Sequence, residues 1–202
     1  MQARYSRTNQ ALHWVTVLCM LAILPLAWVM TNAKEGTAFS MALFNWHKTL
    51  GVIVLLVTLW RIARRFADGP PPYPPAISIW EQRIAHAIYW VFFFALIWMP
   101  VTGFLTSGYG GHATKLFNLV QTPELLPKNK GLSDLFAGLH GAGQWAIYIL
   151  IGLHLGAVAF HLIGRRDGLL GRMLPAYAAE PSPDMSRDAR TPGYRTTPLP
   201  AE

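Results

Sequence analysis

The sequence has few charged residues and almost no cysteine. Only 13% of its 202 residues are charged, which is about half of the roughly 25% usual in soluble proteins. The single cysteine, Cys19, cannot form an intramolecular disulfide, so cysteine says nothing about the compartment. Carboxylates are absent from the long apolar stretches, and Glu81 and Asp167 stand only at their ends. These absences exclude a charge-rich soluble domain and a disulfide framework.

Long hydrophobic stretches are what the sequence has in abundance. Hydrophobic residues make up 52% of the chain, and an apolar run of about 20 residues is enough to cross a bilayer as a helix. The predicted fold is all-α, an integral membrane four-helix bundle within residues 1–174. Its spans are expected at about Ala11–Met30, Trp46–Ile62, Ile84–Ser107 and Leu139–Gly164. Residues 175–202 are rich in Pro, Ser, Arg and Asp and are expected to form a disordered cytoplasmic tail.

The connections between the spans differ in length and composition. Residues 31–45 are expected to be a short connection, and DGPPPYPPA at 68–76 is a proline-rich loop that cannot be helical. Residues 108–138 form the longest predicted loop, with a short interfacial helix at 114–120. Pro25, Pro100 and Gly103 predict bends inside their helices.

The basic residues divide between the two sides of the predicted bundle. Arginines collect at the amino end, at the second-to-third loop and at the carboxyl end, whereas the opposite side carries only lysines among its basic residues. Under the positive-inside rule, both termini are therefore cytoplasmic. The net charge of +7 does not indicate nucleic-acid binding, because the basic residues flank apolar spans and form no patch with its own fold.

The fourth stretch carries histidines at a spacing that matches the membrane. Fourteen residues separate His140 from His154, a rise of about 21 Å and almost four helical turns, so both share one face. Ionisable groups inside a span are costly and are functional candidates. Two imidazoles stacked at two depths favour two metal centres, which in an apolar helical bundle are most simply two b-type haems, since a haem iron takes axial imidazoles from facing helices.

Depth predicts which histidines face one another. His47 and His140 both lie in the outer half and form one predicted pair. For His154 in the inner half, His13 on the first span is the natural partner. His161, two turns after His154 on nearly the same face, is not excluded as a ligand by spacing alone. The roles of His86, close to the interface, and of His112, in the long loop, stay open.

The histidines and the arginines of the second span also have simpler interpretations. One buried histidine can simply hydrogen-bond a carbonyl of a neighbouring helix, but four at matching depths on three helices favour metal ligation. Arg61, Arg64 and Arg65 are expected chiefly to be topology signals, with contact between one of them and a haem propionate as the alternative.

Several stretches resemble the prokaryotic cytochrome b561 family of dihaem membrane proteins. These are YSRTNQALHW, NWHKTLG, the proline loop, LHGAGQWAIYILIGLHLGAVAFH and RRDGLLGRMLP, within about residues 4–176. The resemblance implies a multi-pass protein of the bacterial inner membrane. It further implies that His13 with His154, and His47 with His140, ligate the irons of two haem b groups (protohaem IX). His161 then takes a quinone or proton role.

The resemblance also implies an electron-transfer function. One family branch oxidises superoxide on the periplasmic side and reduces ubiquinone in the bilayer, which makes the chain an oxidoreductase of the superoxide:quinone type. Lysines on the outer face, with Lys48 beside His47, are candidates for steering a small anion. Another branch anchors a periplasmic hydrogenase or dehydrogenase, a redox protein that would dock on the long loop of residues 108–138. A third interpretation, a histidine-based divalent-metal transporter, expects carboxylates within the spans, where the sequence has none.

Overall fold

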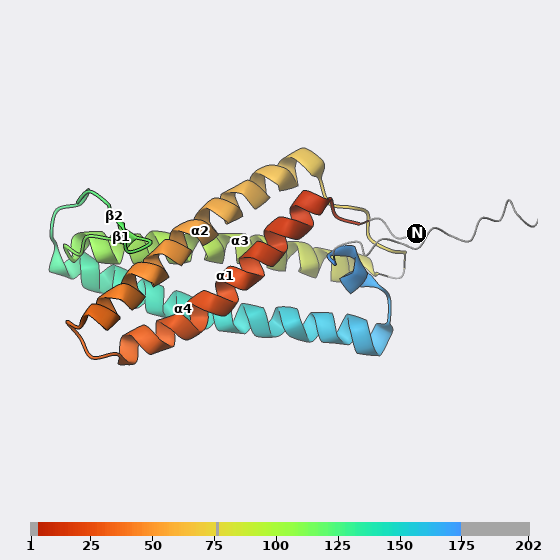
Figure 1. Cartoon of the computed structure of the whole chain (residues 1–202). Helices are drawn as coiled ribbons and strands as arrows, with labels where there is room; N and C mark the ends of the chain where they lie inside the picture. The colour runs from red at the N-terminus through yellow and green to blue at the C-terminus, as the bar shows by residue number, and fades with distance from the viewer. Residues whose placement is uncertain (1–3, 76, 175–202) are drawn as a thin grey trace, which may run out of the picture.

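Four long helices form the body of the molecule. The computed structural model describes residues 4–75 and 77–174, so the predicted tail lies outside the described residues. The helices are α1 (Arg7–Asn32), α2 (Ala38–Asp68), α3 (Ile79–Tyr109) and α4 (Lys130–Ala159). Figure 1 shows an elongated bundle in which the pair α1 and α2 lies across the pair α3 and α4. The expected helical bundle is therefore present.

Each long helix begins at a residue whose side chain caps it. Ser6, Thr37, Ser78 and Asn129 all accept a hydrogen bond from a backbone N–H three residues further on. At Ser78 the Glu81 carboxylate also accepts from the Ser78 backbone N–H, which completes a capping box. These caps satisfy donors that the first helical turn leaves free.

Two helices begin well before the apolar stretches that predict them. The second begins at Ala38, so the connection expected over residues 31–45 is much shorter. The fourth begins at Lys130, which shortens the loop expected over 108–138. In both cases a polar cap, Thr37 or Asn129, starts the helix well before the hydrophobic run, and hydropathy alone does not detect such a start.

The outer surface of the bundle is apolar. By length and composition, α1, α3 and the continuous helical stretch Lys130–Arg165 can cross a membrane. The remaining helix, α2, carries Lys48 and Arg61 and is not among these candidates. Large apolar side chains are exposed along the helices, whereas the most deeply buried side chains include three threonines, Thr49, Thr58 and Thr102. Such a surface suits contact with lipid, as expected of a multi-pass membrane protein.

The loop after α3 contains a small β-hairpin, so the interfacial helix expected at residues 114–120 is wrong. Strands β1 (Lys115–Leu116) and β2 (Val120–Gln121) pair antiparallel around Phe117 and Asn118, both at positive φ. The Phe117 N–H donates to Thr49 Oγ1 of α2 at 2.9 Å. Backbone hydrogen bonds to α2 and to the partner strand thus replace those that a helix would have made.

The bundle has two distinct ends. The hairpin end contains the β-hairpin and the α1–α2 connection. The arginine end contains the start of α1, the proline loop and the chain after α4. There α4 continues into a π-helical turn, Phe160–Arg165, and a short 3₁₀ helix, Leu169–Arg172. Trp14 Nε1 of α1 donates to the Met173 carbonyl at 2.9 Å, and Arg172 donates to the carbonyls of Pro71 and Pro72. These contacts fasten the returning chain to the arginine end.

Candidate functional site

Four histidines form two pairs at two levels of the bundle. At the hairpin end, the ring centroids of His47 on α2 and His140 on α4 are 6.2 Å apart, with the ring planes at 75°. At the arginine end, the centroids of His13 on α1 and His154 on α4 are 6.4 Å apart, at 63°. Both combinations are those that the sequence analysis paired, and α4 contributes one ring to each.

The separation within each pair matches two imidazoles that share one metal ion. A ligating imidazole nitrogen lies about 2 Å from its metal, which puts each ring centroid roughly 3 Å away and two opposed centroids roughly 6 Å apart. The observed centroid distances of 6.2 and 6.4 Å are close to this value. Each pair can therefore hold a haem iron through two axial nitrogens.

The tautomer of His140 is set by the neighbouring helix. Its Nδ1 lies 3.0 Å from the Met99 carbonyl oxygen of α3 and 3.1 Å from Thr102 Oγ1. Because a carbonyl only accepts, Nδ1 carries the proton, and the Nε2 lone pair is free for a metal. Hydrogen bonds of this kind orient histidine ligands and raise their basicity.

A cavity lies beside the hairpin-end pair. It has a volume of about 180 Å³ and is lined by residues of α1, α2 and α4, among them Trp28, Thr31, His47, His140 and Gln144. The buried Nδ1 of His47 has no hydrogen-bond partner among the described residues. A cavity lined by both imidazoles, one of which has its tautomer fixed for ligation, fits part of a porphyrin.

The arginine-end pair lies where α4 has an open flank. His154 is exposed, and its ring also meets Phe92 edge-on at 5.7 Å. A Cβ added at Gly152 or Gly156 would meet no atom within 4 Å. Both glycines are two residues from His154 and lie on the far face of α4, so it is the exposure of His154 itself that leaves its ring open to a ligand.

His161 belongs to a different cluster from the two pairs. Its Nδ1 lies 2.5 Å from Asp167 Oδ2, and Asp167 Oδ1 accepts from the Leu169 N–H at 3.2 Å. Burial raises the pKa of the Asp167 carboxyl, but hydrogen bonds from His161 and the Leu169 amide outweigh this effect and leave the pKa below its usual value. The π-helical turn and the left-handed Arg166 bring this pair together, and π-helical turns often occur at functional positions.

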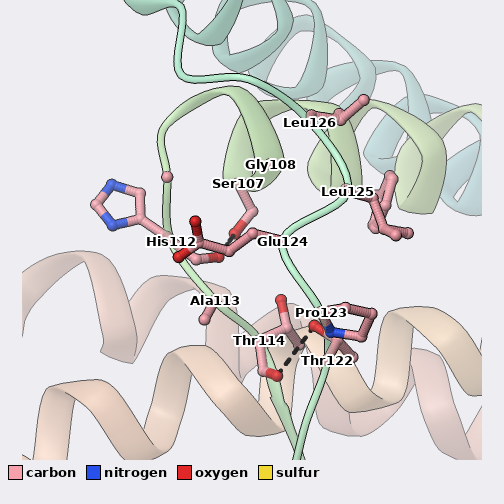
Figure 2. Close-up of a pocket in the computed structure, with 12 residues that line it drawn as sticks. Ser107, Gly108, His112, Ala113, Thr114, Thr122, Pro123, Glu124, Leu125 and Leu126 are labelled. Atoms are coloured by element: carbon pink, nitrogen blue, oxygen red, sulfur yellow. Dashed lines mark hydrogen bonds between the residues drawn. The ribbon is translucent and has the colours of Figure 1, made fainter.

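The two histidines without an assigned role lie apart from both pairs. His86 Nε2 accepts from Trp90 Nε1 at 3.0 Å on the exposed side of α3. His112 lies in the loop at the hairpin end, beside a pocket lined by Ser107, Pro123 and Leu125 among others. Figure 2 shows its imidazole turned away from Leu125, while Ser107 Oγ donates to its backbone carbonyl at 2.9 Å.

Charge is distributed unevenly between the two ends. The hairpin end carries five lysines, with the carboxylates Glu35, Glu124 and Asp134 among them. Lys130 is paired with Asp134 at 2.6 Å, whereas Lys48 is half-buried beside His47. The arginine end carries nine described arginines and three described carboxylates. Both ends are positive, and the arginine end is the more positive of the two.

The histidines do not form a larger metal-binding cluster. Across residues 4–75 and 77–174, no group of three or more His, Cys, Asp or Glu side chains comes close enough to hold one ion. The carboxylates that a divalent-metal site would add to the histidine pairs are not grouped with them in this part of the chain.

Sequence reasoning missed three groups that matter to the site. The Met99 carbonyl and Thr102 orient His140 from α3, and Asp167 contacts His161. Neither α3 residue has a sequence signal, because the contact depends on how α3 packs against α4. For Asp167 the only available signal was its place six residues after His161.

Comparison with known proteins shows one matching family model and several relatives. The family model described as prokaryotic cytochrome b561 matches residues 4–176. Cytochrome b561 homolog 1 of Escherichia coli K12 is 23% identical over 172 residues, which cover 85% of this chain and 97% of the relative. The probable superoxide oxidase CybB of Yersinia pestis is 26% identical over 180 residues, 87% of this chain and 98% of the relative. Cytochrome b561 homolog 2 of E. coli K12 is 24% identical over 173 residues, 85% and 91% of the two chains.

Proposed function

The chain belongs to the prokaryotic cytochrome b561 family, and on that premise we propose that it carries two b-type haems and passes electrons from superoxide to ubiquinone. The family is one of membrane electron-transfer proteins with b-type haem. The number of haems, their ligands and the two substrates are our proposal. The relative named as a probable superoxide oxidase, 26% identical over 98% of its own length, supports this choice of substrates.

The observation that carries the proposal is the pair of neighbouring imidazoles at each of the two levels. His47 and His140 would hold one haem, and His13 and His154 the other. When bound, the haems supply one-electron chemistry, while the protein fixes their position and surroundings. Since two imidazoles would hold each iron, superoxide and ubiquinone would not need to bind the iron to exchange electrons with the haem.

Orientation in the membrane follows from the charge at the two ends. We assign the arginine end, with nine arginines and three carboxylates among the described residues, to the cytoplasm of a bacterial inner membrane. Both termini then face the cytoplasm, and the hairpin end faces the periplasm. Lys48, half-buried next to His47, stands where it can attract superoxide towards the outer pair.

Protons for quinone reduction enter through the chain's own side chains. Two superoxide ions, one ubiquinone and two protons yield two dioxygen molecules and one ubiquinol. His161, whose Nδ1 contacts Asp167 at 2.5 Å, can hold a proton on the side where the proposed topology puts the cytoplasm. The Asp167 carboxylate orients the imidazole through this contact. His161 is therefore the candidate proton donor to quinone, with Asp167 orienting it.

The test is ubiquinone reduction by the purified chain. The protein is reconstituted in liposomes with ubiquinone and exposed to superoxide from an enzymatic source, with dismutase added to a parallel sample. We expect ubiquinol to form and dismutase to abolish its formation. Haem that is reduced by superoxide while the ubiquinone stays oxidised would contradict the proposed acceptor, and haem that stays oxidised would contradict the proposed donor.

The β-hairpin favours a second candidate, a haem subunit that receives electrons from a periplasmic redox protein. At its tip Leu119 is 83% exposed and Val120 63% exposed, which suits a protein contact. Replacing both with Ser would then release an iron–sulfur partner that co-purifies with the native chain. Ubiquinol formation from superoxide without any partner favours the first candidate.

A further inference from the structure

We propose that Arg61 binds a propionate carboxylate of the haem held by His13 and His154 and raises the midpoint potential of that haem. This inference rests on the proposed function, because it requires a haem at the arginine-end pair. It distinguishes Arg61 from Arg64 and Arg65, its neighbours on α2.

Arg61 occupies on α2 the level that a histidine occupies on α1 and α4. It follows His47 by fourteen residues, the same interval that separates His140 from His154. That interval corresponds to a rise of about 21 Å and almost four turns, so His47 and Arg61 share one face of α2. At the hairpin end this face presents an imidazole, and at the arginine end it presents a guanidinium.

Contacts place the guanidinium beside the arginine-end pair. Arg61 Nη1 donates to Thr16 Oγ1 at 3.3 Å, and Thr16 is buried one turn after His13 on α1. The guanidinium carbon lies 5.4 Å from the centroid of the Phe93 ring on α3. Arg61 is therefore a neighbour of any group held between the imidazoles of His13 and His154.

The adjacent arginines have other partners. Arg64 forms an ion pair with Asp68 at 2.7 Å, and the guanidinium of Arg65 lies 4.7 Å from the centroid of the Tyr89 ring. Each is thus held by a residue outside the histidine pair. Of the three arginines near the end of α2, Arg61 is the one in contact with the side chains that surround the site.

The carboxylates of the arginine end are also held elsewhere. Within the described part of the chain they are Asp68, Glu81 and Asp167, which contact Arg64, Arg165 and His161 respectively. A guanidinium has five N–H donors, and a charge within an apolar span is costly unless an anion or other acceptors surround it. Haem brings two carboxylates, and the fork of an arginine matches a carboxylate with two parallel hydrogen bonds.

This contact would favour electron flow towards the arginine end. Oxidised haem carries one more positive charge than reduced haem, so a nearby cation favours the reduced form and raises the potential. The carboxylate in turn favours the oxidised form unless a cation neutralises it. Arg61 acts in both ways on the haem at its own level and only weakly on the other, about 21 Å away along the helix axis.

The test compares Arg61→Gln with Arg64→Gln in the purified holoprotein, using potentiometric titration of the haem absorbance and haem quantification. We expect Arg61→Gln to shift one of the two midpoint potentials to a lower value, or to lose one haem. Both haems should be unchanged in Arg64→Gln. Unchanged potentials and haem content in Arg61→Gln would overturn the assignment. A wild-type chain without two haems would overturn the proposed function itself.

A second variant, Arg61→Lys, tests the assignment if Arg61→Gln accumulates too poorly to purify. Arg61→Lys keeps the charge but replaces the fork with a single ammonium. Redox-difference infrared spectra are recorded with haem that carries ¹³C in its propionate carboxyls. We expect a carboxylate band to move in Arg61→Lys and to stay in place in Arg64→Lys. A band that stays in place in Arg61→Lys would also overturn the assignment.

Discussion

The imidazole of His140 lies directly over Gly103 of the neighbouring helix. A Cβ added at Gly103 would stand 3.1 Å from His140 Cε1 and 3.3 Å from its Nδ1. Side chains normally do not approach this closely. The ring also contacts the Met99 carbonyl and Thr102, which lie within about one helical turn of Gly103 on α3. Because Gly103 has no side chain, the His140 ring can occupy this position against α3.

Replacing Gly103 with Ala should displace the His140 ring. We expect a shift in the midpoint potential or electron paramagnetic resonance signal of one haem, and a loss of stability of about 1–3 kcal/mol, as is usual for an overpacked core. Gly51→Ala is the matched control, because its Cβ would meet only Pro100 Cβ at an ordinary 3.9 Å. Equal effects of the two substitutions on the haem signal would contradict this account of Gly103.

Replacing Asp167 with Asn should slow ubiquinone reduction and leave haem reduction by superoxide unchanged. The carboxylate keeps His161 oriented, and the loss of a positioned proton donor typically costs about 10²-fold or more in rate. Stopped-flow absorbance separates the two steps. Asp134→Asn, which removes the exposed carboxylate paired with Lys130 at the other end, should leave both steps unchanged. A slower haem reduction in Asp167→Asn would instead indicate general damage.

The same contact should depend on pH. Because the pKa of Asp167 is lowered in the fold, its carboxylate stabilises the folded chain at pH values above the ordinary pKa of an aspartate. This stabilisation is lost as the pH falls through the folded-state pKa. In thermal unfolding, the difference between wild type and Asp167→Asn should therefore shrink as the pH falls into this acidic range. A difference that stays constant down to acidic pH would contradict the contact.

Replacing Lys48 with Gln should slow the reaction with superoxide more than replacing Lys130 does. Lys48 adjoins His47, whereas the charge of Lys130 is offset by Asp134 at 2.6 Å. We expect a several-fold loss in rate at low ionic strength that disappears at high salt, because steering between charges is screened. Equal rates for the two variants at low salt would remove the steering role.

The proposed topology can be tested with single cysteines. In a chain with Cys19→Ala, a cysteine at Lys128 of the hairpin end should react with an impermeant maleimide in intact spheroplasts. A cysteine at Arg7 of the arginine end should react only after lysis. The opposite labelling pattern would invert the assignment and move the superoxide-facing haem to the other pair.

The sequence predicted the helices well where hydrophobicity alone determines them. It missed the polar first turns of α2 and α4, because Thr37 and Asn129 start these helices before the apolar run begins. It also missed the β-hairpin, whose turn puts Phe117 at positive φ. That conformation is unfavourable for phenylalanine, and contacts with α2 compensate for it, so local propensity gives no sign of it.

For the site, the sequence predicted which histidines face one another but not what surrounds them. The spacing along α4 was sufficient to relate His140 to His154, because one helix has a fixed rise and turn. Spacing left open whether His161 was a ligand, since its contact with Asp167 depends on a π-helical turn and a left-handed residue. The contacts of His140 with α3 depend on packing between helices, which periodicity does not specify.

The most direct test of the central claim is haem quantification on the purified chain and on two histidine variants. Pyridine haemochrome spectra with amino-acid analysis should give two haem b per wild-type chain, one per chain in His140→Ala and one in His154→Ala, with different residual reduced-minus-oxidised spectra. A wild-type chain with no haem, or variants that keep both haems, would contradict the claim that each histidine pair holds one haem.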